Sequence, residues 1–338
     1  MTEVAVKRPN HRAIEALRLD AAAEVDRLCA LLRNDVLHRL RRRGAVVGCS
    51  GGVDSSVVLA LAVRALGPER VLAVMMPERE SSPESAELAS GWAAELRART
   101  VVEDITAALE GSGCYARRDE AVRRVFPEYG SGWTCRIVLP GSLLDEETLN
   151  IFTLTVVRPD GMEFHHRVLS GDFYQIMAAS SFKQRTRMAM LYYHAELHNY
   201  AVIGTANRNE HDLGFFVKFG DGGSDISPIQ HLHKSQVYQL ADHLAVPEDI
   251  RSRPPTSDTY SAGGTQEEFF FRVPFEILDP IWLGWERGIP VEEIAVGLGI
   301  TPAQVRRVVD DLTRKGRTTE YLRLPTLTYP AAAERKSA

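Results

Sequence analysis

A short polar segment with two adjacent glycines carries the strongest chemical signal in the sequence. It reads Cys49-Ser50-Gly51-Gly52-Val53-Asp54-Ser55-Ser56, follows the apolar run 45–48 and precedes an apolar helical stretch that ends near Ala65. A strand that turns through glycines into a helix exposes backbone N–H groups to an anion, and the helix N-terminus adds positive potential. The segment therefore predicts a loop that binds pyrophosphate.

Asp54 indicates that such a loop would bind its anion together with a metal. A carboxylate next to phosphate is unfavourable unless a cation lies between them, and Mg²⁺ is held by few carboxylates plus phosphate oxygens. The glycines are not followed by Lys-Ser/Thr, and the pattern GxGxxG is absent, so neither a Walker motif nor a dinucleotide fingerprint is present. A tight strand–helix turn without a ligand is the alternative, which Asp54 disfavours.

A second polar segment, GTANRNE at 204–210, also follows an apolar run. Its Glu210 is a candidate second oxygen ligand for Mg²⁺. The glycine-rich stretch 214–225 comes next, and Lys234 and Arg185 are cations that would neutralise phosphate charge. From spacing alone, each of these cations fits a solvated surface residue equally well.

Alternating strand and helix patterns would position these segments. We expect one amphipathic helix over 14–43 with Gly44 at its C′ position, strands at 71–76, 100–103 and 200–203, and helices opening near Ser82 and spanning 179–199. This alternation predicts a parallel sheet covered on both faces.

The rhythm changes between residues 113 and 171. The β-rich runs 151–157 and 162–169 are joined by Arg-Pro-Asp-Gly, which predicts a β-hairpin inserted into the sheet domain. Two interpretations of this insertion stay open. It is either a decorative or dimer-edge element, or a lid or wall of the substrate site.

Composition limits the possible partners and compartments. The chain has 338 residues, 44% of them hydrophobic, and a net charge of −5, so nothing demands a nucleic acid or a membrane surface. No apolar run reaches the roughly 20 residues that span a bilayer. The first residues lack an apolar signal core, and the four cysteines form no CxxC pair. We expect a cytoplasmic protein with reduced thiols.

Taken in order, six segments resemble the motifs of the NAD synthase family, which belongs to the N-type ATP pyrophosphatases. They are SGGVDSS, SSFKQRTRM, GTANRNE, FFVKFGDGGSD, HLHKSQV and PPTSD. The resemblance covers about 14–112 and from 180 to the tail. It implies a Rossmann-like, doubly wound parallel sheet of the adenine nucleotide alpha hydrolase type, with a catalytic domain over 1–284, an insertion at 113–171 and a helical C-terminal region with a tail over 285–338.

The same resemblance implies an activity and a set of catalytic and binding residues. The expected enzyme is a ligase that adenylates the carboxylate of deamido-NAD with ATP and amidates it with ammonia, giving NAD, AMP and pyrophosphate. Asp54, Lys234 and Glu210 would be catalytic, and Asp54 and Glu210 would hold Mg²⁺. The implied ATP contacts are Gly48, Ser50, Gly51, Gly52, Val53, Asp54, Ser55, Thr205, Lys234 and Thr256. The implied contacts to deamido-NAD are Arg185, Lys218 and Asp225.

The resemblance also implies a homodimer whose long helices form the interface. No glutaminase domain is visible, so we expect free ammonia or ammonia supplied by a separate glutaminase. Cys49 fits a buried thiol better than a nucleophile.

Departures from the family pattern leave alternatives open. Tyr321-Leu322 replaces a His-Lys pair, Ser180-Ser181 replaces Gly-Asn, and 268–271 reads Glu-Phe-Phe-Phe instead of an acidic-Leu-Gly stretch. These changes keep open an amide ligase that acts on a different carboxylic acid. Residues 290–315 resemble a helix-turn-helix, but the overall acidity disfavours a DNA-binding protein.

Overall fold

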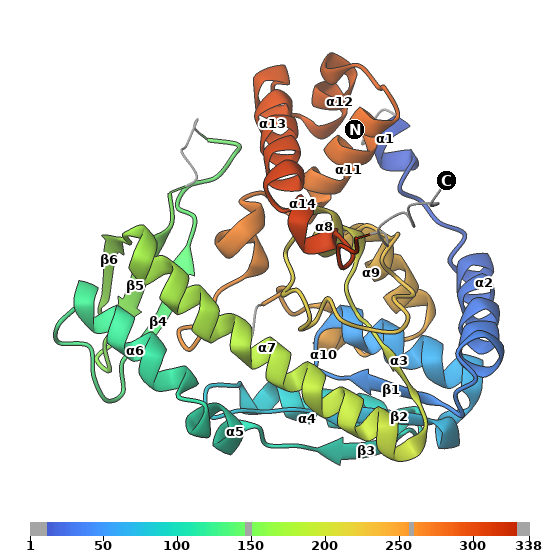
Figure 1. Cartoon of the computed structure of the whole chain (residues 1–338). Helices are drawn as coiled ribbons and strands as arrows, with labels where there is room; N and C mark the ends of the chain where they lie inside the picture. Colours follow the sequence, from blue (N-terminus) through green and yellow to red (C-terminus); the bar gives the residue numbers. More distant parts are fainter. Residues whose placement is uncertain (1–11, 146–150, 257–259, 330–338) are drawn as a thin grey trace, which may run out of the picture.

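A four-stranded parallel sheet forms the centre of the computed structural model, which describes residues 12–145, 151–256 and 260–329 (Figure 1). Its order is β3 (Arg99–Val102), β2 (Val71–Met75), β1 (Ala45–Gly48) and β7 (Ala201–Ile203). Every pairing is parallel. The apolar runs of β1, β2 and β7 are buried, as expected for strands that are covered on both faces.

Alternate residues of each strand face the two helical layers. Val47 and Ala73 pack in one core with α2 (Ala21–Asn34), α3 (Val53–Leu66), α4 (Pro83–Glu95) and α9 (Lys234–His243). Val46 and Leu72 pack on the opposite face against α7 (Ser170–His198). The predicted doubly wound α/β fold is therefore confirmed.

The N-terminal helix differs from the prediction. Instead of one helix over 14–43, the chain forms α1 (Arg12–Glu15), α2 and the π-helix η1 (Asp35–Arg39). Asp20 begins α2 as an N-cap and accepts a hydrogen bond from Ala23 N at 3.0 Å, which interrupts an otherwise continuous apolar pattern. Gly44 does not end the helix as the predicted C′ residue. The helix is capped at Leu40, and the left-handed residue that follows the cap is Arg41, with φ of 54°. Instead, a side chain at Gly44 would collide with the carbonyl of Arg70.

The insertion contains the predicted hairpin together with a strand that the prediction missed. Strands β5 (Thr153–Val157) and β6 (Glu163–Arg167) pair antiparallel, and β4 (Thr134–Val138) extends them to a three-stranded sheet. Two helices precede it, α5 (Thr106–Gly111) and α6 (Cys114–Val125). Helix α7 begins at Ser170, nine residues before the predicted start. It therefore runs from the insertion across the parallel sheet (Figure 1).

The remaining elements are helical. Short ones are η2 (Pro68–Arg70), α8 (Arg208–Leu213), α10 (Glu248–Arg251) and η3 (Glu267–Phe271). A second core surrounds α11 (Phe275–Glu286), α12 (Val291–Leu298) and α13 (Pro302–Thr318), and α14 (Glu320–Arg323) follows. Helix α11 continues across residue 284. The expected boundary between a catalytic domain over 1–284 and a C-terminal region over 285–338 stays a prediction. Within the described ranges, no helix is long and apolar enough to cross a membrane.

Candidate active site

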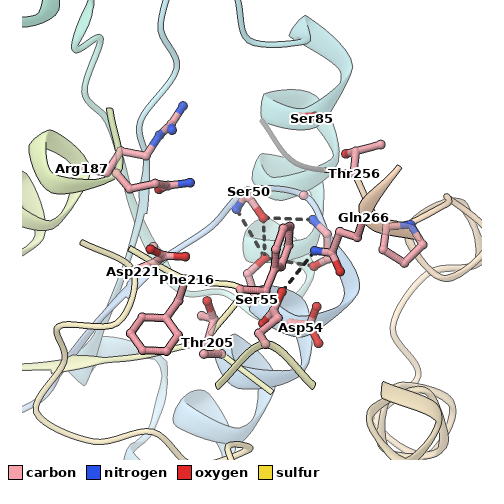
Figure 2. A pocket seen from close by; sticks show the side chains of 18 of the residues that line it. Ser50, Asp54, Ser55, Ser85, Arg187, Thr205, Phe216, Asp221, Thr256 and Gln266 are labelled. Atoms are coloured by element: carbon pink, nitrogen blue, oxygen red, sulfur yellow. Dashed lines mark hydrogen bonds between the residues drawn. The ribbon is translucent and has the colours of Figure 1, made fainter. Parts of the chain in front are cut away.

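A cavity of about 400 Å³ opens where the parallel strands β1, β2 and β7 end. Residues 48–55 line it after β1, residues 75–77 after β2, and residues 203–206 after β7. Ligands of open α/β sheets bind at this edge, beyond the carboxyl ends of the strands. Figure 2 shows Ser50, Ser55 and Asp54 between Arg187 and Asp221 on one side and Thr256 and Gln266 on the other.

The glycine loop has the strand–turn–helix form that the sequence predicts. Gly51 has φ of +76°, and a Cβ there would collide with the carbonyl of Ser85. Helix α3 begins directly after Gly52, whose φ and ψ are extended. The Ser55 hydroxyl donates to the carbonyl of Gly52 at 2.9 Å and accepts from Ser50 N at 3.3 Å. These contacts fix a cup at a helix N-terminus, which suits an anion.

Two carboxylates, a lysine and an asparagine meet beside this cup. The Lys234 ammonium donates to Asp54 Oδ2. Asn207 joins the two acids, because its Nδ2 donates to Asp54 Oδ1 and its backbone N–H donates to Glu210 Oε2, each at 3.1 Å. Gln266 Nε2 donates to Glu210 Oε1 at 3.1 Å. The fold thus gathers residues from four distant parts of the chain.

The charges in this cluster are not balanced. Burial, followed by the neighbouring Asp54 carboxylate, raises the pKa of Glu210 to about 8. Burial alone would lower the pKa of Lys234, but the charges of Asp54 and Glu210 outweigh it and raise that pKa, so the lysine stays charged. One lysine therefore faces two acids, and a further cation would stabilise both as carboxylates.

The structure brings the predicted ATP residues together. Gly48, Ser50, Gly51, Gly52, Val53, Asp54, Ser55, Thr205, Lys234 and Thr256 all line the cavity, and so does Glu210.

Arg185, Lys218 and Asp225 do not line this cavity. Arg185 Nε donates to the Lys218 carbonyl at 3.2 Å, so these two lie together. The Lys218 ammonium donates to the carbonyls of Tyr321 and Leu324, each at 2.9 Å. Asp225 accepts from Tyr192 Oη at 3.1 Å and from Val202 N at 2.8 Å. Their predicted contact with the acid substrate stays a prediction.

The family assignment follows from comparison with known proteins. The sequence pattern of the NAD synthase family matches residues 24–122 and 155–321. A protein of Rhizobium rhizogenes named NH3-dependent NAD+ synthetase is 49% identical over 317 residues, which cover 94% of this chain and 95% of that protein. The chain belongs to the NAD synthase family.

Other relatives agree in sequence or in fold. The NH3-dependent NAD+ synthetase of Thermotoga maritima is 38% identical over 245 residues, covering 72% of this chain and 81% of that one. The NH3-dependent NAD synthetase structure from Campylobacter jejuni has a TM-score of 0.58 at 20% identity and covers 92% of this chain and 100% of that chain. The NMN synthetase structure from Francisella tularensis has a TM-score of 0.62 at 21% identity, covering 93% and 100%. At such identities these two structures show a shared fold.

Sequence reasoning missed two cavity residues of this NAD synthase family member, Arg187 and Asp221, and also Asn207, which is buried beside the cavity. Asn207 had a usable signal, since Asn-x-x-Glu is a capping box and Asn207 Oδ1 accepts from Glu210 N at 3.1 Å. Arg187 Nε donates to the carbonyl of Met76 at 3.3 Å. Arg187 reaches the cavity because it lies on the face of α7 that points at it, which could not be known before the helix was placed. Burial raises the pKa of the cavity residue Asp221 to about 6. Its neighbouring glycines gave no sign of burial.

Helix α7 lines the cavity along much of its length. The contributing residues are Met177, Ser180, Ser181, Gln184, Arg187, Met188 and Leu191. They are spaced so that one face of the helix points at the cavity. The span from Met177 to Leu191 is roughly 20 Å. One end of the cavity therefore lies at the parallel sheet and the other at the insertion.

Proposed function

We propose that the chain is an ammonia-dependent NAD synthase that converts deamido-NAD to NAD with ATP. A carboxylate oxygen of deamido-NAD attacks the α-phosphorus of ATP, and pyrophosphate leaves with the electrons of the broken P–O bond. Ammonia then bonds to the acyl carbon, AMP leaves with the electrons of the C–O bond, and the nitrogen loses a proton. The observation that carries this proposal is the Asp54–Lys234–Asn207–Glu210 cluster beside the Ser50–Ser55 cup.

Mg²⁺ fits this cluster on chemical grounds. The acids Asp54 and Glu210 offer carboxylate oxygens, and burial together with the neighbouring Asp54 charge raises the pKa of Glu210, an effect that a bound cation would oppose. Within the described residues there is no group of three or more acidic, histidine or cysteine side chains arranged as a metal site. Mg²⁺ held by these two acids would thus complete its shell with phosphate oxygens and water. When bound, it would neutralise phosphate charge.

The protein groups around the phosphates supply positioning and electrostatic stabilisation. The backbone N–H groups of the cup hold the phosphates, and Lys234 places a permanent positive charge beside them. Lys234 is 1% exposed, so its charge acts in a poorly screened setting. Thr205 and Thr256 line the same cavity and would contact ATP.

Deamido-NAD is the acid that the relatives support over another carboxylic acid. The 49% identical relative spans nearly the whole chain and is named an NH3-dependent NAD+ synthetase. Arg185, Lys218 and Asp225 would contact this substrate next to the cavity. The carbonyls of Tyr321 and Leu324 hold Lys218 from the C-terminal segment. Tyr321, which replaces the family His-Lys pair together with Leu322, therefore borders the same region.

Ammonia would enter free or from a separate glutaminase. All four cysteines are buried without disulfides, which fits a reducing cytoplasm. Burial raises the pKa of Cys49 to about 12, so this thiol is a poor nucleophile.

A homodimer would cover the exposed apolar side of α7. Tyr193 and Leu197, one turn apart on this helix, are 55% and 61% exposed. Large apolar side chains that gather on one helix mark an interaction surface.

The test is a purified-enzyme assay with ATP, Mg²⁺, ammonium chloride and one acid at a time. We expect deamido-NAD to give NAD, AMP and pyrophosphate in equal amounts. Nicotinic acid mononucleotide serves as the comparison acid. Faster amide formation from the comparison acid, or no AMP with deamido-NAD, would reject the proposal.

A further inference from the structure

The cavity has an apolar end wall made of Phe152, Met177, Tyr260 and Phe269. These residues belong to the core of the inserted antiparallel sheet or pack against it. The Tyr260 hydroxyl donates to Met177 Sδ at 3.0 Å, and the Tyr260 and Phe269 ring centroids are 5.1 Å apart. Phe152 stacks on Phe173 at 4.6 Å. The insertion thus builds part of the reaction cavity.

Two short links connect this wall to the carboxylate cluster. Gln266 lies on the same segment as Phe269 and donates to Glu210. The ring of Phe215 is 5.7 Å from that of Phe269, and Phe215 N donates to the Glu210 carbonyl at 2.7 Å. The wall therefore flanks the acids beside the phosphate cup, and Met75 and Met76 line the same cavity at the end of β2.

Ser180 supplies a polar atom at this end. It is 2% exposed and lines the cavity. Its hydroxyl lies near Tyr260, whose raised pKa it moderates, but no partner meets the usual distance and angle for a hydrogen bond. A buried hydroxyl with unused hydrogen-bonding capacity is costly unless a ligand satisfies it.

We propose that this end of the cavity is an ammonia subsite, in which the apolar end wall and the Ser180 hydroxyl admit uncharged ammonia and keep water away from the activated acid. The proposal rests on the proposed function and names the subsite of its second substrate.

The chemistry of the wall selects the uncharged nucleophile. An apolar surrounding penalises ammonium, because burial disfavours the charged form of an amine. A buried water needs two to four polar partners. The wall and Ser180 offer two hydroxyls, and that of Tyr260 already donates to Met177 Sδ. Water that reached the acyl-adenylate would bond to the acyl carbon and expel AMP, which regenerates the acid and spends ATP without making an amide.

The wall residue Phe152 lies outside the segments that match the family pattern, 24–122 and 155–321. The subsite is therefore partly a property of the insertion. A matched control exists in the same sheet, because Phe164 packs in the same core and stacks on Trp133 at 6.4 Å. Phe164 is not among the residues that line the cavity.

The experiment compares F152A, F152L, S180A and the control F164A in the full-length enzyme. AMP and NAD are measured together while ammonium chloride is varied at constant ionic strength. For the wild type we expect one AMP per NAD at saturating ammonia. F152A should raise the AMP-to-NAD ratio at least about threefold, and F152L should raise it less. S180A should raise the KM for ammonia about three- to tenfold with little change in the KM for ATP.

The outcomes separate this inference from the proposed function. Absence of NAD formation by the wild type rejects the proposed function itself. An AMP-to-NAD ratio that is unchanged in both F152A and F152L rejects the role of the wall in excluding water. So does an F164A variant whose AMP-to-NAD ratio rises as much as that of F152A. If F152A fails to fold, F152L and S180A decide. An S180A variant that weakens ATP and ammonia equally rejects the subsite.

Discussion

At the scale of single residues, Asp54 carries the most defined role. It contacts Lys234 and Asn207 at the start of α3. We expect D54N to reduce AMP formation at least about 100-fold, since an amide neither binds Mg²⁺ strongly nor balances the lysine. Its melting temperature should stay within about 5 °C of the wild type. S56A is the control, because its hydroxyl donates to the Gly52 carbonyl on the same helix at 3.0 Å. Wild-type turnover in D54N would refute the metal role.

Glu210 should make metal–nucleotide binding depend on pH. Its pKa of about 8 means that a proton competes with Mg²⁺ below that pH. We expect the affinity for Mg²⁺ with a non-hydrolysable ATP analogue to rise up to tenfold per pH unit between about pH 7 and 8, then level off. Calorimetry in buffers of different ionisation enthalpy should record proton release.

The same group affects stability with a definite sign. The folded pKa of Glu210 lies above its ordinary value of 4.5, so between these two values the folded chain binds a proton that the unfolded chain has lost. The free energy of unfolding should fall as pH rises from about 5 to 8. The E210Q variant should lack this contribution and also lack the pH-dependent part of metal binding. Identical pH profiles in both proteins would contradict the assignment.

Arg185 tests the substrate side of the site. Its guanidinium donates to the Lys218 carbonyl and lies outside the main cavity. We expect R185A to raise the KM for deamido-NAD about tenfold, as for the loss of one charged hydrogen bond, with the KM for ATP changed less than about twofold. R185K, which keeps the charge, should recover part of the loss. A defect confined to ATP would contradict the role.

At the scale of elements, helix α8 couples its own cap to the site. Asn207 caps the helix through Glu210 N and donates to Asp54 from its amide. N207A should lower the free energy of unfolding by about 1–2 kcal/mol and also slow AMP formation. N207S keeps a capping oxygen but loses the amide donor, so it should restore most of the stability and little of the rate. Chemical denaturation and initial rates measure the two effects. Full activity in N207S would show that the cap alone matters.

At the scale of the whole molecule, the exposed side of α7 should govern assembly. Tyr193 and Leu197 are more than half exposed near the end of this helix. The double variant Tyr193→Glu and Leu197→Glu should weaken the dimer at least about 100-fold, since charges would be buried against apolar partners. Light scattering after gel filtration reads the mass directly. A wild-type monomer, or a variant dimer of unchanged affinity, would contradict a homodimer built on this surface.

Features that depend on neighbours in the chain were predictable from the amino-acid order. The turn at Ser50–Ser55 and the alternation of strands and helices follow from local glycines and apolar periods, so both were predictable. Local signals failed where a distant contact decided the outcome. The short strand β4 pairs with β5, and although Thr134, Ile137 and Val138 favour a strand, a run of five residues does not define one without its partner.

Which charged side chains come into contact depends on how the chain folds in three dimensions. Lys234 lies 180 residues from Asp54 in the chain, and the order of the parallel strands brings them to one edge of the sheet. The same folding places Phe152 of the insertion at the reaction cavity and leaves Arg185 and Lys218 beside it. Such contacts depend on topology and on packing across the sheet, which residue types and local spacing do not specify.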